Sequence, residues 1–228
     1  MNVVSANAVT KNYLQGSMEV PALRGIDLVI AEGEFVSLAG PSGSGKTTFL
    51  NLIGCLDKIS GGELQIGGTD VATLNPVQLA HLRREKIGFV FQSYNLIPVL
   101  TAYENVELPL VLLKKYSEAA IRERVMAMLA EVGLNGLEGR RPSDLSGGQQ
   151  QRVAIARALV KEAKIVLADE PTANLDSDNS VSILELMKEL NQSKKVTFLF
   201  STHDSLVMKY ARRLITMRDG KIVSDERR

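Results

Sequence analysis

Two hydrophobic patterns alternate along most of the chain. Short, almost wholly apolar runs occupy residues 34–40, 164–170 and 196–202, which is typical of strands in a parallel sheet that is covered on both faces. We expect a helix over residues 46–56, directly after the first run, and another over residues 177–191, where leucines and isoleucine recur at helical spacing. The alternation of strands and helices predicts an α/β fold with a mostly parallel sheet.

The two ends and the middle of the chain depart from this alternation. The N-terminal part and the tail at 212–226 are typical of antiparallel strands, and Asp219-Gly220 predicts a hairpin turn within the tail. From about residue 93 to residue 160 helical periodicity dominates. We therefore expect one domain over residues 1–228, with an N-terminal antiparallel β subdomain and an α-helical subdomain inserted at about 93–160.

Composition and charge narrow the class of protein. The net charge of +1 gives no broad basic surface, so nucleic acid is not an expected partner. The single cysteine, Cys55, excludes an internal disulfide framework and is expected to be a buried thiol. The first residues lack a secretion signal, and no apolar run reaches the roughly 18 residues that cross a bilayer. We expect a cytoplasmic protein unless a partner holds it at a membrane.

The strongest chemical motif is "GPSGSGKTT", which follows the first predicted strand and precedes a helix. It matches the phosphate-binding pattern G-x-x-x-x-G-K-[ST] in the context that this pattern requires. The glycines let the backbone wrap around phosphates, Lys46 places a charge against the β and γ phosphates, and the Thr47 hydroxyl suits Mg²⁺. The expected nucleotide-binding residues of this loop are Gly40, Pro41, Ser42, Gly43, Ser44, Gly45, Lys46, Thr47 and Thr48.

Polar residues follow the two other apolar runs. Asp169 and Glu170 end the run at 164–170, at the sheet edge where open α/β folds bind ligands. Asp169 suits the Mg²⁺ shell, and Glu170 suits a general base for the attacking water, although such acids alone are also common helix caps. His203 follows the run at 196–202. Beside a nucleotide site it is a candidate γ-phosphate donor, whereas alone it would be an ordinary polar strand terminus.

Taken in order, "GPSGSGKTT", "LSGGQ", "IVLADEP" and "STHD" resemble the ATP-binding subunit of an ABC transporter over nearly the whole chain. In that family two subunits pack head to tail, and each ATP lies between the phosphate loop of one and the "LSGGQ" of the other. The resemblance therefore implies a homodimer on ATP binding, with Ser146, Gly147, Gly148 and Gln149 at the γ-phosphate of the partner's nucleotide. The positive end of the helix that begins there would favour that anion.

The resemblance assigns three further residues. Gln92 corresponds to the glutamine that approaches Mg²⁺ and the water, although a surface glutamine is the alternative without the other motifs. Asp176 corresponds to a residue that communicates across the dimer, and Tyr13 to the aromatic residue that stacks on adenine. With Glu170 present, the resemblance implies an active ATPase whose cofactors are ATP and Mg²⁺.

Within the family, the chain looks most like the lipoprotein-release and macrolide-export branch. This implies a separate integral membrane permease with a large periplasmic domain, which would hold the chain at the cytoplasmic face of the inner membrane. The permease's coupling helix would dock beside Gln92, with anchors from residues 93–106, unless that segment packs internally. Two alternatives remain: an ATP-driven regulator of a cell-wall enzyme that moves no substrate, and a soluble ABC-type ATPase of DNA repair or translation.

Overall fold

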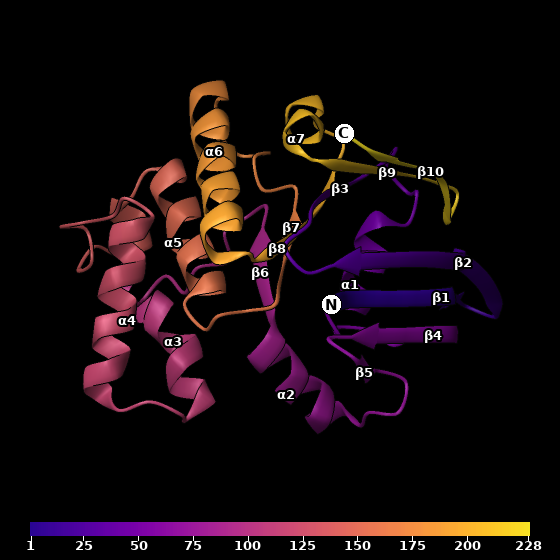
Figure 1. The fold of residues 1–228 in the computed structure, drawn as a ribbon, viewed down its shortest axis with the longest axis horizontal. Helices are drawn as coiled ribbons and strands as arrows, with labels where there is room; N and C mark the ends of the chain where they lie inside the picture. The colour runs from indigo at the N-terminus through magenta and orange to yellow at the C-terminus, as the bar shows by residue number, and fades with distance from the viewer.

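The predicted parallel sheet lies at the centre of the molecule (Figure 1). The computed structural model describes residues 1–228 and places six strands in the order β10-β9-β3-β8-β7-β6. Only the β9–β10 pair is antiparallel. The strands are β3 (Phe35–Ala39), β6 (Ile87–Phe91), β7 (Ile165–Asp169), β8 (Thr197–Thr202), β9 (Arg213–Arg218) and β10 (Lys221–Arg227). The predicted hairpin in the tail is confirmed, because Asp219 and Gly220 both adopt positive φ between β9 and β10.

A second, antiparallel sheet is built from the N-terminal part of the chain, as predicted. Its four strands follow the order β2-β1-β4-β5. They are β1 (Asn2–Gln15), β2 (Met18–Ala31), β4 (Gly61–Ile66) and β5 (Thr69–Asp70).

The helices fill the connections between strands. They are α1 (Lys46–Ile53), α2 (Pro76–Lys86), α3 (Ala102–Leu113), α4 (Glu118–Glu131), α5 (Gly147–Leu159), α6 (Ser177–Lys194) and α7 (Ser205–Tyr210), with a 3-10 turn at Pro142–Asp144. The first predicted helix ends earlier than expected, because Gly54 caps it and Cys55 adopts a left-handed φ of 54°. The second runs past residue 191 to Lys194.

Every regular element between residues 93 and 160 is helical. The limits of an inserted subdomain in this segment stay a prediction, since α5 also packs directly on the sheet. A Cβ at Gly88 of β6 would lie 2.7 Å from the carbonyl oxygen of Ala158 in α5. Glycine at position 88 therefore lets α5 approach the strand closely.

The central sheet separates two hydrophobic cores, which explains why its strands are apolar on both faces. Figure 1 shows α3 to α6 on one side of it and the antiparallel sheet on the other. In β8, Phe198 and Phe200 face the helices, whereas Leu199 faces α1 and the antiparallel sheet. Cys55 is buried in the second core, as expected, and its burial raises the pKa of the thiol to about 11. None of the helices combines the length and the hydrophobicity needed to span a bilayer.

Candidate nucleotide-binding site

The phosphate loop leaves the carboxyl end of β3 and leads directly into α1. Gly40, Gly43 and Gly45 have φ values of 152°, 78° and 102°, in a region that side-chain-bearing residues rarely adopt. A Cβ at Gly40 would collide with the carbonyl oxygen of Met217 in β9. The glycines are thus required both by the backbone conformation and by the close approach of a neighbouring strand.

Lys46, the first residue of α1, folds back over the loop. Its Nζ donates to the carbonyl oxygens of Gly40 at 2.7 Å and Pro41 at 3.0 Å, and the residue is buried. The ammonium group is therefore held beside the loop backbone, where a phosphate group would meet it.

Asp169 is the last residue of β7 and lies near the start of α1. Burial raises the pKa of its carboxyl group, and the negative charge of Glu170 raises it further. The side chains of Ser201, Lys46 and Thr47 lower the pKa, but the net shift is upward. A nearby cation would favour the ionised carboxylate.

The Glu170 carboxylate is held by three contacts from the end of β8 and the residue that follows. Thr202 Oγ1 donates to Oε2 at 2.9 Å, and the backbone N–H of His203 donates to Oε1 at 3.2 Å. His203 Nδ1 lies 2.6 Å from the same Oε1. Glu170 itself has a positive φ of 46°, and its N–H donates to the carbonyl oxygen of Ser201. A side chain seldom adopts this conformation without tertiary support, and such residues often mark functional sites.

Most of the expected site residues line one cavity of about 600 Å³ at the carboxyl ends of the parallel strands. The expected residues that line it are Pro41, Ser42, Gly43, Gly45, Lys46, Thr47, Thr48, Gln92, Asp169, Glu170 and His203. Ala22 and Ser201 also line it, although no motif singled them out. Gly40 and Ser44 do not, because Gly40 packs against β9 and Ser44 is buried within the loop.

The cavity is lined by three groups whose oxygen atoms could bind Mg²⁺ as ligands: the Thr47 hydroxyl, the Gln92 amide and the Asp169 carboxylate. In nucleotide sites this ion is bound by one or two protein groups together with phosphate oxygens and water. These residues therefore fit Mg²⁺ that arrives with a nucleotide.

Tyr13 lies apart from the residues that line the cavity. Its hydroxyl donates to Asp57 Oδ2 at 2.8 Å, and Lys11 Nζ lies 4.8 Å from its ring centroid. Burial, followed by the Asp57 contact, raises the pKa of this phenol, and the Thr48 side chain beside it acts in the opposite direction. Tyr13 thus lies next to the end of the phosphate loop, and stacking on adenine stays a prediction.

The "LSGGQ" residues form the beginning of α5, outside the cavity. Ser146 caps the helix: its Oγ accepts from the Gln149 N–H at 3.3 Å, while Gln149 Oε1 accepts from the Ser146 N–H at 2.9 Å. A Cβ at Gly147 would lie 2.9 Å from the Tyr94 hydroxyl, and one at Gly148 would lie 2.7 Å from Asn179 Oδ1. The two glycines therefore keep this helix start free of side chains while the loop after β6 and the first turn of α6 pack against it.

Asp176 has a structural role within the chain as the N-cap of α6. Its Oδ1 accepts from the Asn179 N–H at 2.8 Å, and its Oδ2 accepts from Asn179 Nδ2 at 2.7 Å. Because the Asn179 side chain also borders Gly148, Asp176 is connected to the start of α5 through one residue. Its role across a dimer stays a prediction.

A network that no motif indicated joins the loop after β6 to the rest of the site. Asn174 Nδ2 donates to the Gln92 carbonyl at 3.0 Å, and the Tyr94 hydroxyl donates to the Asn174 carbonyl at 3.3 Å. Arg157 of α5 donates to the carbonyls of Asn95 at 2.6 Å and Tyr94 at 2.8 Å. In the sequence, Tyr94 and Asn174 lie in loops next to motif residues. This position alone does not indicate the residues with which they form hydrogen bonds.

Known proteins match this arrangement. The family described as "ABC transporter" matches residues 23–173. The macrolide export ATP-binding/permease protein MacB of Syntrophobacter fumaroxidans is 46% identical over 97% of the chain, which spans 31% of that longer protein. The lipoprotein-releasing system ATP-binding protein LolD of Anaeromyxobacter dehalogenans is 44% identical over 97% of this chain and 93% of its own length.

A solved structure agrees with these relatives. The dimeric ATP-binding cassette MJ0796 of Methanocaldococcus jannaschii, in a post-hydrolysis state with ADP and Pi, is 46% identical, with a TM-score of 0.89 and 98% of both chains covered. The sequence agrees with these relatives and the fold with the solved cassette, so the chain belongs to the ABC transporter family and is an ATP-hydrolysing cassette of that family.

Proposed function

We propose that this chain supplies the ATPase activity for a separate integral membrane permease that exports or extracts a lipoprotein or a hydrophobic, macrolide-like cargo. The observation that carries the proposal is the separation of two half-sites in one chain. The cavity holds Lys46, Asp169 and Glu170, whereas the start of α5 with Ser146 lies outside it. A second copy packed head to tail would bring the two together, and the similar MJ0796 cassette is a dimer.

In the half-site formed by the cavity, different residues bind the nucleotide and carry out hydrolysis. Lys46 and the backbone of the phosphate loop bind the phosphates, and Tyr13 stacks on adenine. Thr47, Gln92 and Asp169 would hold Mg²⁺, which would neutralise charge on the phosphate oxygens.

The chemical step falls to the residues at the ends of β7 and β8. Glu170 takes the proton of the attacking water, and His203 donates to the γ-phosphate. From the other copy, Ser146, Gly147, Gly148 and Gln149 close the site through the N-terminus of α5, and Asp176 communicates across the interface.

The relatives, rather than the cavity, support the choice of a permease as the partner. Because two relatives, at 46% and 44% identity, carry the names of macrolide export and lipoprotein release, we place this chain at the cytoplasmic face of the inner membrane. There it is bound to a permease with a large periplasmic domain.

The test is an affinity purification of the full chain from native membranes, in detergent, with Glu170→Gln and ATP present. Recovery of a permease with a large periplasmic domain supports the proposal. The same preparation carrying Lys46→Ala is the control, because loss of the phosphate contact should prevent the ATP-bound dimer. Recovery of soluble proteins alone would exclude a permease-coupled role and favour a soluble ABC-type ATPase. A captured permease that releases no cargo but controls a cell-wall enzyme would support the regulatory alternative.

A further inference from the structure

The ring of Tyr13 is held from two sides by residues that no motif singled out. Its hydroxyl donates to Asp57 Oδ2 at 2.8 Å, and the ammonium group of Lys11 lies over one face of the ring, 4.8 Å from its centroid. Lys11 Nζ also donates to Asp57 Oδ1 at 2.6 Å and to the Lys58 carbonyl at 2.7 Å. One carboxylate therefore binds both the hydroxyl and the cation, and the three side chains form a closed cluster.

The cluster is more buried at its base than at the ring. Lys11 is 9% exposed, whereas Tyr13 is 41% exposed. A largely buried ammonium group needs an anion and further acceptors to offset its desolvation, and Asp57 and Lys58 supply them. The Lys11–Asp57 pair is thus a fixed base, on which the more exposed ring of Tyr13 is anchored at its hydroxyl and along one face.

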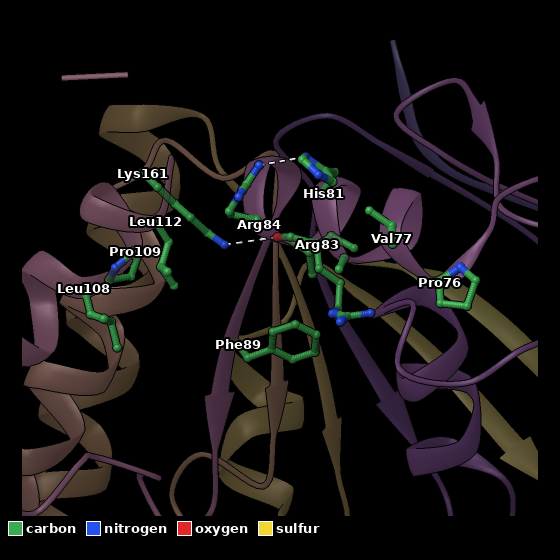
Figure 2. Close-up of a pocket in the computed structure, with 12 residues that line it drawn as sticks. Pro76, Val77, His81, Arg83, Arg84, Phe89, Leu108, Pro109, Leu112 and Lys161 are labelled. Atoms are coloured by element: carbon green, nitrogen blue, oxygen red, sulfur yellow. Dashed lines mark hydrogen bonds between the residues drawn. The ribbon is translucent and has the colours of Figure 1, made fainter. Parts of the chain in front are cut away.

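Asp57 is itself fixed by the segment between α1 and β4. Figure 2 shows Arg83 extending from α2, and its Nη1 donates to the Cys55 carbonyl at 2.6 Å. Ser60 Oγ accepts from the Asn12 N–H at 3.0 Å. The segment is therefore attached to α2 near one end and, near the other, to β1, the strand that carries the ring. These attachments fix the position of the carboxylate relative to the Tyr13 hydroxyl.

We propose that Asp57 and Lys11 are positioning residues for the base of the nucleotide: they hold the Tyr13 ring in one orientation, so that adenine stacks on the face opposite Lys11. The inference rests on the proposed function, in which Tyr13 stacks on adenine. A side chain that is ordered before its ligand arrives loses less rotamer freedom on binding. Thr48, which lines the nucleotide cavity, lies beside Tyr13, so the fixed ring adjoins the end of the phosphate loop.

The contacts of the two positioning residues restrict their effect to the base. Neither Lys11 nor Asp57 lines the nucleotide cavity, and their side-chain hydrogen bonds go to each other, to Tyr13 and to Lys58. Their influence on a nucleotide therefore passes through the ring and leaves the phosphates untouched. A ligand that has the phosphates but no base is the reference that separates this role from a general structural one.

The experiment titrates the full chain, in the presence of Mg²⁺, with ADP and separately with inorganic pyrophosphate, which has no base. Tyr13→Ala should weaken ADP binding about tenfold, because the stacking of a base on an aromatic side chain is lost. Asp57→Ala and Lys11→Met should each weaken it about three- to fivefold, since the ring remains but must be ordered on binding. The affinity for pyrophosphate should stay unchanged in all three variants.

A double-mutant cycle identifies the ring as the route of the effect. Asp57→Ala added to Tyr13→Ala should cause no further loss of ADP affinity, because no ring is left to position. Tyr13→Phe keeps the ring and the Lys11–Asp57 pair but lacks the anchoring hydroxyl, so it should weaken ADP binding about as much as Asp57→Ala does. Glu32→Ala is the matched control and should bind ADP normally. It breaks a pair with Lys164 at 2.9 Å next to the amino end of β3, the end opposite the cavity.

The outcomes separate this inference from the proposed function. Additive losses in the double variant, or equal losses of ADP and pyrophosphate affinity after Asp57→Ala, would overturn the inference, because the two residues would then support the whole domain. Normal ADP affinity in Asp57→Ala, Lys11→Met and Tyr13→Phe together with a loss in Tyr13→Ala would also overturn it and leave the stacking role standing. Normal ADP affinity in Tyr13→Ala would reject the stacking role in the proposed function, and the inference with it.

Discussion

Glu170 Oε1 lies 2.6 Å from His203 Nδ1, at the junction of two neighbouring parallel strands. If the ring donates its Nδ1 proton to the carboxylate, Nε2 is left to reach a ligand, and it can donate to a phosphate only when it carries a proton as well. The Thr202 hydroxyl fixes the other carboxylate oxygen at 2.9 Å. The geometry thus fixes the candidate base and aligns the imidazole beside it before a nucleotide binds.

Replacing Glu170 by glutamine should separate binding from chemistry. The amide can still accept from Thr202, so the local structure should persist, but it cannot take a proton from water. Steady-state ATP hydrolysis should fall about 10²- to 10⁴-fold, with unchanged ATP affinity and with the dimer trapped in its closed state. Measurements of phosphate release, nucleotide titration and sedimentation test these three outcomes.

The matched control is Glu189→Gln, which alters an exposed glutamate on α6 that is not part of the cavity. It should hydrolyse ATP at the normal rate. A Glu170→Gln protein that did the same would show that another group activates the water.

Replacing Ser146 by arginine should block the half-site formed by the start of α5. The change places a long cation where the partner's phosphate is expected, so dimer-dependent hydrolysis should be lost while a single chain still binds ATP. Cooperative ATP hydrolysis and ATP titration measure the two effects separately.

The same substitution also removes a helix cap, which costs about 1 kcal/mol. Ser117→Arg controls for that loss, because Ser117 caps α4 in the same way, accepting from the Ala120 N–H at 3.3 Å. Ser117→Arg should keep cooperative hydrolysis. If Ser146→Arg keeps it as well, α5 does not complete a partner's site.

The sequence predicted those parts of the molecule that follow from local chemistry. The apolar runs at 34–40, 164–170 and 196–202 predicted β3, β7 and β8, because a strand buried on both faces has few alternatives. The phosphate loop was found from its glycine-rich pattern between a strand and a helix, and Glu170 from its place at the carboxyl end of a strand, where open α/β folds bind ligands. The end of α1 was misplaced, because the left-handed conformation of Cys55 depends on its surroundings.

Contacts between loops could not be predicted. Asn174 donates to the Gln92 carbonyl across 82 positions of sequence, and Arg157 reaches Tyr94 and Asn95 across more than 60. Backbone carbonyls carry no sequence signal, so these partners became visible only in three dimensions. The sequence analysis likewise assigned Asp176 only a role between subunits and did not predict that it caps α6.

Arg157 is expected to position Gln92 without touching the nucleotide. Burial lowers the pKa of its guanidinium group, and its removal leaves two carbonyls without their donor. Arg157→Met should lower kcat for ATP about tenfold with little change in KM, since the loop that carries Gln92 loses a support equivalent to about 1.4 kcal/mol.

Arg157→Lys should restore part of kcat, because a lysine can reach one of the two carbonyls. Arg124→Met is the control, as Arg124 of α4 makes an exposed ion pair with Glu162. Equal losses of kcat and thermal stability in all three variants would reduce Arg157 to a purely structural residue.

Arg213 should be the strongest charged contributor to stability outside the site. Its side chain, 9% exposed, donates to Asp225 at 2.8 and 2.6 Å, to Glu34 at 2.7 Å and to the Val29 carbonyl at 2.8 Å. These contacts, the Asp225 hydrogen bond first, raise the pKa of Arg213. Removing one partner of a buried ion pair costs about 3–5 kcal/mol, and because Asp225 is partly exposed we expect about 3 kcal/mol for Arg213→Ala.

For a chain of this size such a loss lowers the melting temperature by about 6–12 °C, which calorimetry can measure. The control Arg218→Ala alters an arginine of the same strand. Its side chain is 75% exposed and comes no closer to the Asp219 carboxylate than 3.9 Å, so this ion pair is weak. The substitution should change the free energy of unfolding by less than about 0.5 kcal/mol. If both variants melt at the same temperature, the ion pairs of Arg213 offset only their own desolvation, and the junction between β2, β9 and β10 depends on its apolar contacts.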